Sequence, residues 1–106
     1  MIDQAVRAGT LSELRRDGRL LTKVGTVPVV VFWHDDTAYA IEDRCTHDDG
    51  PLVEGTFDPQ ACTIECPRHG SLFDLTTGKP KTLPAYVPVD TFTVIIEDDT
   101  IKLEVE

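Results

Sequence analysis

The sequence of 106 residues is poor in cysteine and has no long apolar run, and these absences exclude several classes of protein. Its three cysteines are an odd number, which argues against a scaffold held together by disulfides. Its longest apolar run, residues 27–33, is far shorter than a membrane span. The N-terminus shows no basic patch followed by an apolar stretch, the pattern of a signal peptide. We therefore expect a cytoplasmic protein that does not cross a membrane.

Basic residues are also scarce, since ten Lys and Arg face nineteen Asp and Glu, and the formal net charge is −9. Nucleic acid is not an expected partner of so acidic a chain, because its phosphates would be repelled. Residues 42–74 hold eight acids and two bases, a net of −6, whereas residues 1–23 hold five bases and three acids, a net of +2. A partner with a basic surface is therefore expected to dock near the middle of the chain.

The length and the hydrophobic and charged contents of 41% and 27% predict one small globular domain. β-branched and alternating segments, separated by turn residues, predict strands over 19–24, 27–33, 38–42, 61–65, 92–97 and 101–105. Residues 10–13, Thr-Leu-Ser-Glu, fit a capping box that starts a short helix, and Gly18 is placed to end it. Many short strands with regular turns predict an all-β sandwich or barrel.

Two pairs of metal-binding side chains stand out in the middle of the chain. Cys45 and His47 form a C-x-H motif, and after eighteen residues Cys66 and His69 form a C-x2-H motif. Two thiolates and two imidazoles suit zinc or an iron–sulfur cluster with mixed ligands. Zinc sites usually group like ligands, whereas here each loop offers one Cys and one His. This pairing favours a site with two irons, one held by two Cys and the other by two His, as in Rieske [2Fe–2S] centres.

The motifs, together with Gly50-Pro51-Leu52 and the run from Gly70 to Asp74, resemble the Rieske ferredoxin family. The ferredoxin components of multicomponent ring-hydroxylating dioxygenases are the nearest resemblance, and it extends over nearly the whole chain. It implies an antiparallel β-sandwich with an inserted cluster-binding subdomain and one short N-terminal helix. The chain would then be a single domain, residues 1–106, with a base of residues 1–42 and 86–106 and an insertion of residues 43–85.

The resemblance also implies the roles of the four ligands and of a third segment. Cys45 and Cys66 would hold the buried iron of one [2Fe–2S] cluster per chain, and His47 and His69 would hold the outer iron near the surface. The segment 83–85, Leu-Pro-Ala, would cover the cluster.

Two further residues bear on the reduction potential, because hydrogen bonds to the sulfurs raise it. Ser71 can donate such a bond, whereas Phe73 stands where high-potential relatives carry a Tyr and cannot donate one. We expect a potential toward the low end of the Rieske range of about −150 to +300 mV. Of the remaining Cys and His, Cys62 is expected in the core, on a strand face with Ile64, and His34 in a solvated turn.

The function that the resemblance implies is that of a one-electron carrier, not of an enzyme. A monomer would take electrons from a flavoprotein NAD(P)H reductase and pass them to a terminal oxygenase that acts on aromatic rings. Catalysis within the chain would need a second iron held by two His and a carboxylate, and only His34 is left for it. Two alternatives stay open: a zinc-stabilised interaction module, and a small Rieske subunit of another oxidoreductase complex.

Overall fold

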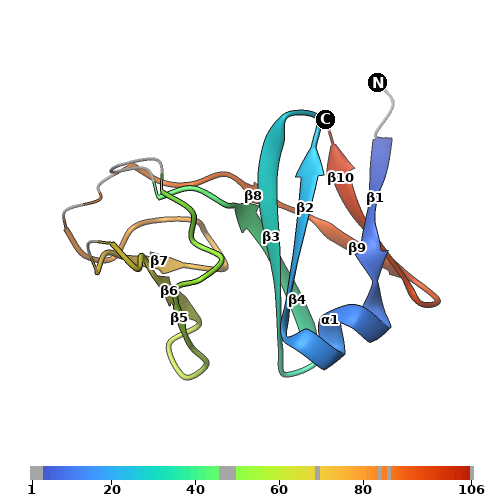
Figure 1. Ribbon diagram of the computed structural model, residues 1–106, viewed down its shortest axis with the longest axis horizontal. Coiled ribbons are helices and arrows are strands. Elements are labelled where there is room, and N and C mark those ends of the chain that lie inside the picture. The colour runs from blue at the N-terminus through green and yellow to red at the C-terminus, as the bar shows by residue number, and fades with distance from the viewer. Residues whose placement is uncertain (1–3, 46–49, 69, 84, 86, 106) are drawn as a thin grey trace.

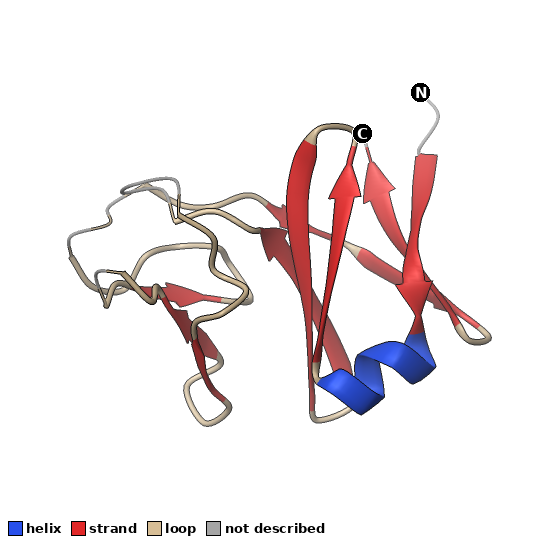
Figure 2. Ribbon diagram, in the orientation of Figure 1, coloured by secondary structure: helices blue, strands red, loops and turns tan. Residues whose placement is uncertain are grey.

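The computed structural model describes residues 4–45, 50–68, 70–83, 85 and 87–105 (Figure 1). Its elements, coloured by type in Figure 2, follow one another in this order: β1 (Gln4–Thr10), α1 (Leu11–Asp17), β2 (Arg19–Val24), β3 (Val27–His34), β4 (Thr37–Glu42), β5 (Thr56–Asp58), β6 (Thr63–Glu65), β7 (Leu72–Asp74), β8 (Thr91–Phe92), β9 (Val94–Glu97) and β10 (Thr100–Val105).

The strands form three antiparallel sheets, with the orders β1-β10-β9, β2-β3-β4-β8 and β5-β6-β7. The first two sheets and α1 lie together, and we call them the base. The third sheet stands beside them, on the left of Figure 1, within residues 43–90, which we call the small lobe. The expected all-β architecture with one short N-terminal helix is confirmed.

The final hairpin follows its alternating sequence. Ile101 and Leu103 of β10 are fully buried, and β10 pairs with both β1 and β9. The strand expected over 92–97, however, is divided between two sheets, since β8 pairs with β4 and β9 pairs with β10. The change occurs at Thr93, whose carbonyl accepts a hydrogen bond from the Glu104 amide at 2.9 Å. One segment thus connects the two sheets of the base.

Strand β3 is buried on both faces. Val29 and Val31 belong to the core of the base, which also contains Leu14 of α1. Val30 and Phe32 point the other way and belong to a second core. That second core is made largely by the small lobe and contains Cys45, Leu52, Ile64, Cys66, Phe73, Leu75, Ala85 and Val89. The strand is therefore a wall between two hydrophobic cores, which explains its continuous run of apolar residues.

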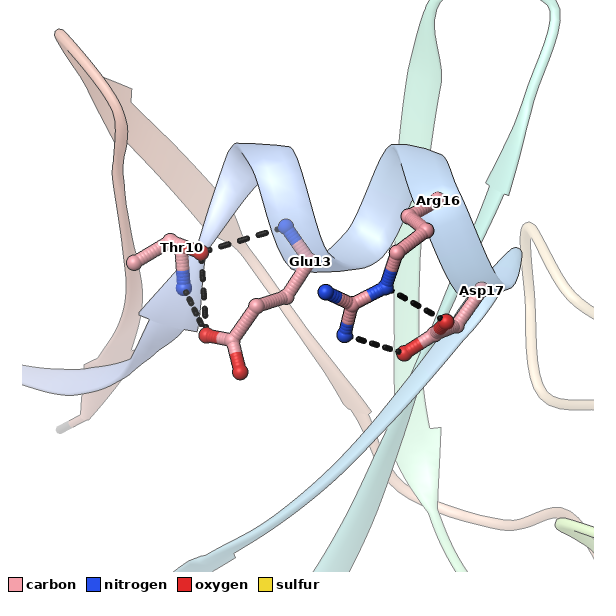
Figure 3. Close-up of polar contacts among 4 residues, drawn as sticks. All are labelled: Thr10, Glu13, Arg16 and Asp17. Atoms are coloured by element: carbon pink, nitrogen blue, oxygen red, sulfur yellow. Dashed lines mark hydrogen bonds and ion pairs between the residues drawn. The ribbon is translucent and has the colours of Figure 1, made fainter.

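Helix α1 begins and ends as the sequence predicts (Figure 3). The Thr10 hydroxyl accepts a hydrogen bond from the Glu13 amide at 3.1 Å, and the Glu13 carboxylate accepts one from the Thr10 amide at 3.2 Å. Gly18 ends the helix with a φ of 82°, in the left-handed region that favours glycine. In the described part of the chain, no helix has the length and apolar character needed to cross a membrane.

Two local expectations are wrong. The strand expected over 61–65 is only Thr63–Glu65, and Cys62 lies in the preceding turn with a φ of 56°. The cause is the Asp58 carboxylate, which accepts hydrogen bonds from the Gln60 and Ala61 amides and prolongs the turn. Cys62 therefore does not share a strand face with Ile64, although it packs half-buried against the second core.

His34 is not a turn residue. It is the last residue of β3, and its ring meets the Phe57 ring of β5 edge-on, with the ring centroids 5.5 Å apart. The strand continues one residue beyond its expected end because β4 pairs with it up to His34. The side chain thus contributes to the contact between the base and the small lobe.

Candidate metal centre

The first of the two motifs lies on a loop between β4 and β5. Cys45 is fully buried, and its amide donates a hydrogen bond to the Gly50 carbonyl at 2.7 Å. Two residues earlier, the buried Asp43 accepts hydrogen bonds from the Leu52 and Val53 amides at 2.7 Å each. The Asp43 carboxylate thus closes the loop around Cys45 and satisfies two amides that no strand pairs.

The second motif lies on a tighter loop between β6 and β7. Cys66 follows β6 directly, and its amide donates to the Ser71 carbonyl at 2.8 Å. The Gly70 amide donates back to the Cys66 carbonyl at 2.9 Å, and Gly70 has a φ of 75°. A left-handed residue at this point lets the chain reverse within a few residues and enter β7. Both cysteines are therefore held by the backbone of short, closed loops.

The two thiols share one environment. Cys45 is 0% exposed and Cys66 is 1% exposed, no disulfide joins them, and both belong to the second core. Thiolates buried in an apolar core need a cation to neutralise them, because burial disfavours an isolated charge. Two cysteines in one core, with no disulfide between them, are placed to act together as soft ligands of a bound metal.

A third segment packs along β7 and covers this core. The Lys81 amide donates to the Leu72 carbonyl at 2.6 Å, and the Leu72 amide donates to the Thr82 hydroxyl at 2.9 Å. Next along the segment, the Ala85 amide donates to the hydroxyl of Ser71 at 3.1 Å. The segment is thus fixed to the second cysteine loop through Ala85, and Pro84 lies outside the described residues. That residues 83–85 cover a cluster stays a prediction.

Ser71 is fully buried, and its hydroxyl accepts the Ala85 bond. An oxygen that already accepts a hydrogen bond keeps its own hydrogen for a second partner. A hydroxyl with a hydrogen to donate, inside the core that holds Cys45 and Cys66, suits the sulfurs of an iron–sulfur cluster. Together with the two buried thiols, it makes the described residues a fit for the expected group.

The two histidines expected as ligands, His47 and His69, lie outside the described residues. Within the described ranges, no group of three or more His, Cys, Asp or Glu side chains is arranged to hold a metal ion. The structure brings Cys45 and Cys66 into one core, and the four-residue ligand set stays a prediction.

Residues 4–93 match the family model of the Rieske [2Fe-2S] domain. The ferredoxin CarAc of Metapseudomonas resinovorans is 41% identical over 80 residues, which cover 76% of this chain and 73% of that protein. The 3-phenylpropionate/cinnamic acid dioxygenase ferredoxin subunit of Photorhabdus laumondii is 38% identical over 80 residues, covering 76% and 75%. The solved ferredoxin of carbazole 1,9a-dioxygenase from Nocardioides aromaticivorans IC177 has a TM-score of 0.88 and 33% identity, covering 94% of this chain and 96% of that one.

The chain therefore belongs to the Rieske [2Fe–2S] family. Within that family it is a ferredoxin of the ring-hydroxylating dioxygenase type, an electron carrier and not an enzyme. The cofactor of the family is a Rieske [2Fe–2S] cluster.

Proposed function

We propose that this ferredoxin takes single electrons from a flavoprotein NAD(P)H reductase and passes them to a terminal oxygenase that hydroxylates aromatic rings, in the cytoplasm. The observation that carries the proposal is the burial of Cys45 and Cys66 in one core, each cysteine within its Cys/His motif. A relative supports the partner class. A 33% identical ferredoxin has been solved in a complex of reduced oxygenase and oxidised ferredoxin of carbazole 1,9a-dioxygenase, with a TM-score of 0.83.

In this proposal Cys45 and Cys66 hold the buried iron and His47 and His69 the outer iron. The division into a base, residues 1–42 and 86–106, and an insertion, residues 43–85, belongs to the same proposal. When bound, the cluster supplies reversible one-electron chemistry, with its outer edge carried by the histidines.

The protein's own residues set the conditions for that chemistry. Both thiols lose their protons on binding iron, and their burial keeps water from the inner side of the site. The Ser71 hydroxyl, which has a hydrogen to donate, would stabilise the more negative, reduced state of a bound cluster. Phe73, fully buried in the same core, offers no second donor, which keeps the potential low among Rieske centres.

The third segment offers a contact for the partner. Leu83 is 77% exposed, although an apolar side chain of this size normally gains from burial, and Lys81 beside it is exposed. Electron-transfer encounters are small and transient, so a few such contacts and a monomeric carrier suffice. We place Leu83 in the surface that a terminal oxygenase covers.

The purified protein tests the proposal directly. It should be red-brown, bleach on addition of dithionite and contain two irons per chain. A colourless protein with stoichiometric zinc would overturn the proposal in favour of a zinc-stabilised interaction module. Reconstitution with the reductases and oxygenases encoded near its gene should then give hydroxylation that depends on this chain. If it supports turnover with none of them and serves another complex, it is a small Rieske subunit of a different oxidoreductase.

The docking contact has its own test. A Leu83→Ser variant should lower the rate of electron delivery to the oxygenase severalfold at low carrier concentration. Leu21→Ser is the matched control, since Leu21 is also an exposed leucine, at 56%, but lies on β2 of the base. Equal rates for both variants would remove Leu83 from the contact surface.

A further inference from the structure

Among the side chains of the base that reach the small lobe is that of Arg19, the first residue of β2. Its guanidinium donates hydrogen bonds to the carbonyls of Val53 and Gly55, the latter at 3.1 Å. Both carbonyls belong to the end of the loop that carries Cys45, more than thirty residues further along the chain. Both bonds come from one terminal nitrogen, Nη1, whose two hydrogens can serve two neighbouring carbonyls at once.

The guanidinium itself is held in place by aromatic rings. It lies over the Phe32 ring, 5.0 Å from its centroid, and Phe32 is nearly fully buried. Phe32 in turn stacks on Phe57 of β5, with the centroids 5.8 Å apart and the ring planes 19° from parallel. A lysine ammonium at position 19 also has hydrogens for two carbonyls, but it lacks the planar group that lies over the Phe32 ring.

Asp43 holds the same stretch of loop from its other side. Its carboxylate accepts from the Leu52 and Val53 amides, and its own amide donates to the Pro28 carbonyl of β3 at 2.8 Å. The peptide groups on both sides of Val53 are therefore fixed, one through its N–H by Asp43 and the other through its C=O by Arg19. Asp43 directly follows β4, so the start of the loop and its end are fixed to each other here.

The end of the loop also has no freedom on its inner side. A Cβ atom on Gly55 would lie 2.0 Å from the Glu65 carbonyl oxygen of β6, so the backbone of the loop touches the backbone of the lobe there. Arg19 thus holds the Cys45 loop against the base at the place where it also touches β6. Cys66 follows β6 directly, so the position of one cysteine relative to the other depends on this junction.

We propose that Arg19 is a positioning residue of the cluster. By tying Val53 and Gly55 to β2, it holds the Cys45 loop at the separation from the Cys66 loop that a [2Fe–2S] cluster requires. The inference rests on the proposed function, because it takes Cys45 and Cys66 as ligands. Its expected effects are on cluster retention and on cluster geometry, at a site that Arg19 does not itself ligate.

The test compares Arg19→Gln and Arg19→Lys with two controls. Arg16→Gln makes the same change of charge at an exposed arginine that pairs with its neighbour Asp17 (Figure 3). Leu14→Ala destabilises the base by opening a cavity in its core, away from both cysteine loops. The measurements are the rate of bleaching in the presence of an iron chelator, the electron paramagnetic resonance spectrum of the reduced cluster, and the unfolding temperature.

Arg19→Gln should lose its cluster about tenfold faster than the parent protein and show shifted g-values, and Arg19→Lys should fall between the two. Arg16→Gln should match the parent, and Leu14→Ala should lower the unfolding temperature but keep the parent spectrum. Parent-like bleaching and spectra in both Arg19 variants, or changes in Leu14→Ala as large as those in Arg19→Gln, would overturn the inference. If Arg19→Gln does not fold, Arg19→Lys decides between these results. A parent protein that binds no [2Fe–2S] cluster would instead overturn the proposed function.

Discussion

The base and the small lobe solve the same problem of backbone hydrogen bonding in different ways. In the base, strands of up to eight residues pair along their length, and the cores form from side chains that alternate or fill both faces of β3. In the small lobe the strands have three residues each, and side chains supply bonds that strands would otherwise make. The side chains of Asp43, Arg19, Thr82 and Ser71 all bond to backbone groups of this lobe.

The difference shows what each region depends on. The base depends mainly on a regular pattern of apolar residues, so many substitutions that keep the pattern will be tolerated. The small lobe depends on particular side chains at particular positions and, in our proposal, on its metal. We therefore expect the lobe to be the more easily unfolded region, and the following experiments test that contrast from the largest expected effect to the smallest.

Cys66→Ser should abolish cluster binding and open the small lobe while the base stays folded. Metal binding energy contributes directly to folding where a site forms only in the native state. Iron content should fall close to zero, and amide exchange should become fast in β5–β7 but stay slow in β3 and β10. Cys62→Ser, at the half-buried turn cysteine, should keep both iron and protection. A Cys66→Ser protein with its full complement of iron would contradict the ligand assignment.

Gly55→Ala should lower the free energy of unfolding by about 3 kcal/mol, because the added Cβ would overlap the Glu65 carbonyl. Gly18→Ala is the control in the base, where the added Cβ meets nothing within 4 Å and only the left-handed φ of 82° opposes it. Its cost should be about 1 kcal/mol. Denaturant titration measures both, and equal losses would mean that the loop end is looser than its backbone contact implies.

Phe73→Tyr should raise the midpoint potential by about 60 mV, equivalent to about 1.4 kcal/mol for a one-electron couple. The reason is the new hydroxyl, placed in the core that holds both thiols and able to donate to a sulfur in the reduced state. Phe92→Tyr adds the same hydroxyl at a half-buried position against the core of the base and should leave the potential unchanged. Protein-film voltammetry decides, and a midpoint that stays level or falls rules out this account of the low potential.

The smallest effect concerns acid stability. The Thr76 hydroxyl, 2.6 Å from the Asp74 carboxylate, lowers the pKa of that carboxyl below its ordinary value. Since the folded-state pKa is lowered, the bond stabilises the fold above the unfolded-state pKa, about 3.9, and this contribution is lost as pH falls through the folded-state pKa. Thr76→Val should therefore cost about 0.5 kcal/mol at pH 7 and make stability less dependent on pH below 4.

Thr77→Val is the matched control for that substitution. The Thr77 hydroxyl accepts from the Lys79 amide instead of contacting Asp74. The stability of Thr77→Val should depend on pH as that of the parent does. The same flattening in both variants would show that Asp74 does not cause the pH dependence.

The sequence predicted the base more fully than the small lobe. The capping box of Thr10 and Glu13 and the alternation of β10 are local patterns, and both were found as expected. The family motif around Cys45 and Cys66 pointed to the site because metal ligands impose a fixed spacing on loops. The role of Arg19 was not visible, since its two acceptors are carbonyls more than thirty residues away and any residue type could supply them.

The strand predicted at Cys62 was wrong for a related reason. The alternating letters of residues 61–65 suit a strand, but the turn before them was lengthened by one carboxylate, that of Asp58. The prediction of a solvated turn at His34 was wrong because the ring packs against Phe57, which belongs to another sheet. Long-range packing and side-chain bonding to loop backbone leave no periodic trace in a sequence, and they are most frequent in the small lobe.

Strand β3, apolar on both faces, limits how this protein could be divided or recombined. Removing residues 43–90 would leave Val30 and Phe32 facing water. Moving residues 43–90 to another protein would require a host strand with apolar side chains on its outer face. The carrier is thus not two modules joined by a linker. Exchange of the cluster-binding segment between distant relatives should succeed only when the apolar residues of β3 that pack against it are exchanged as well.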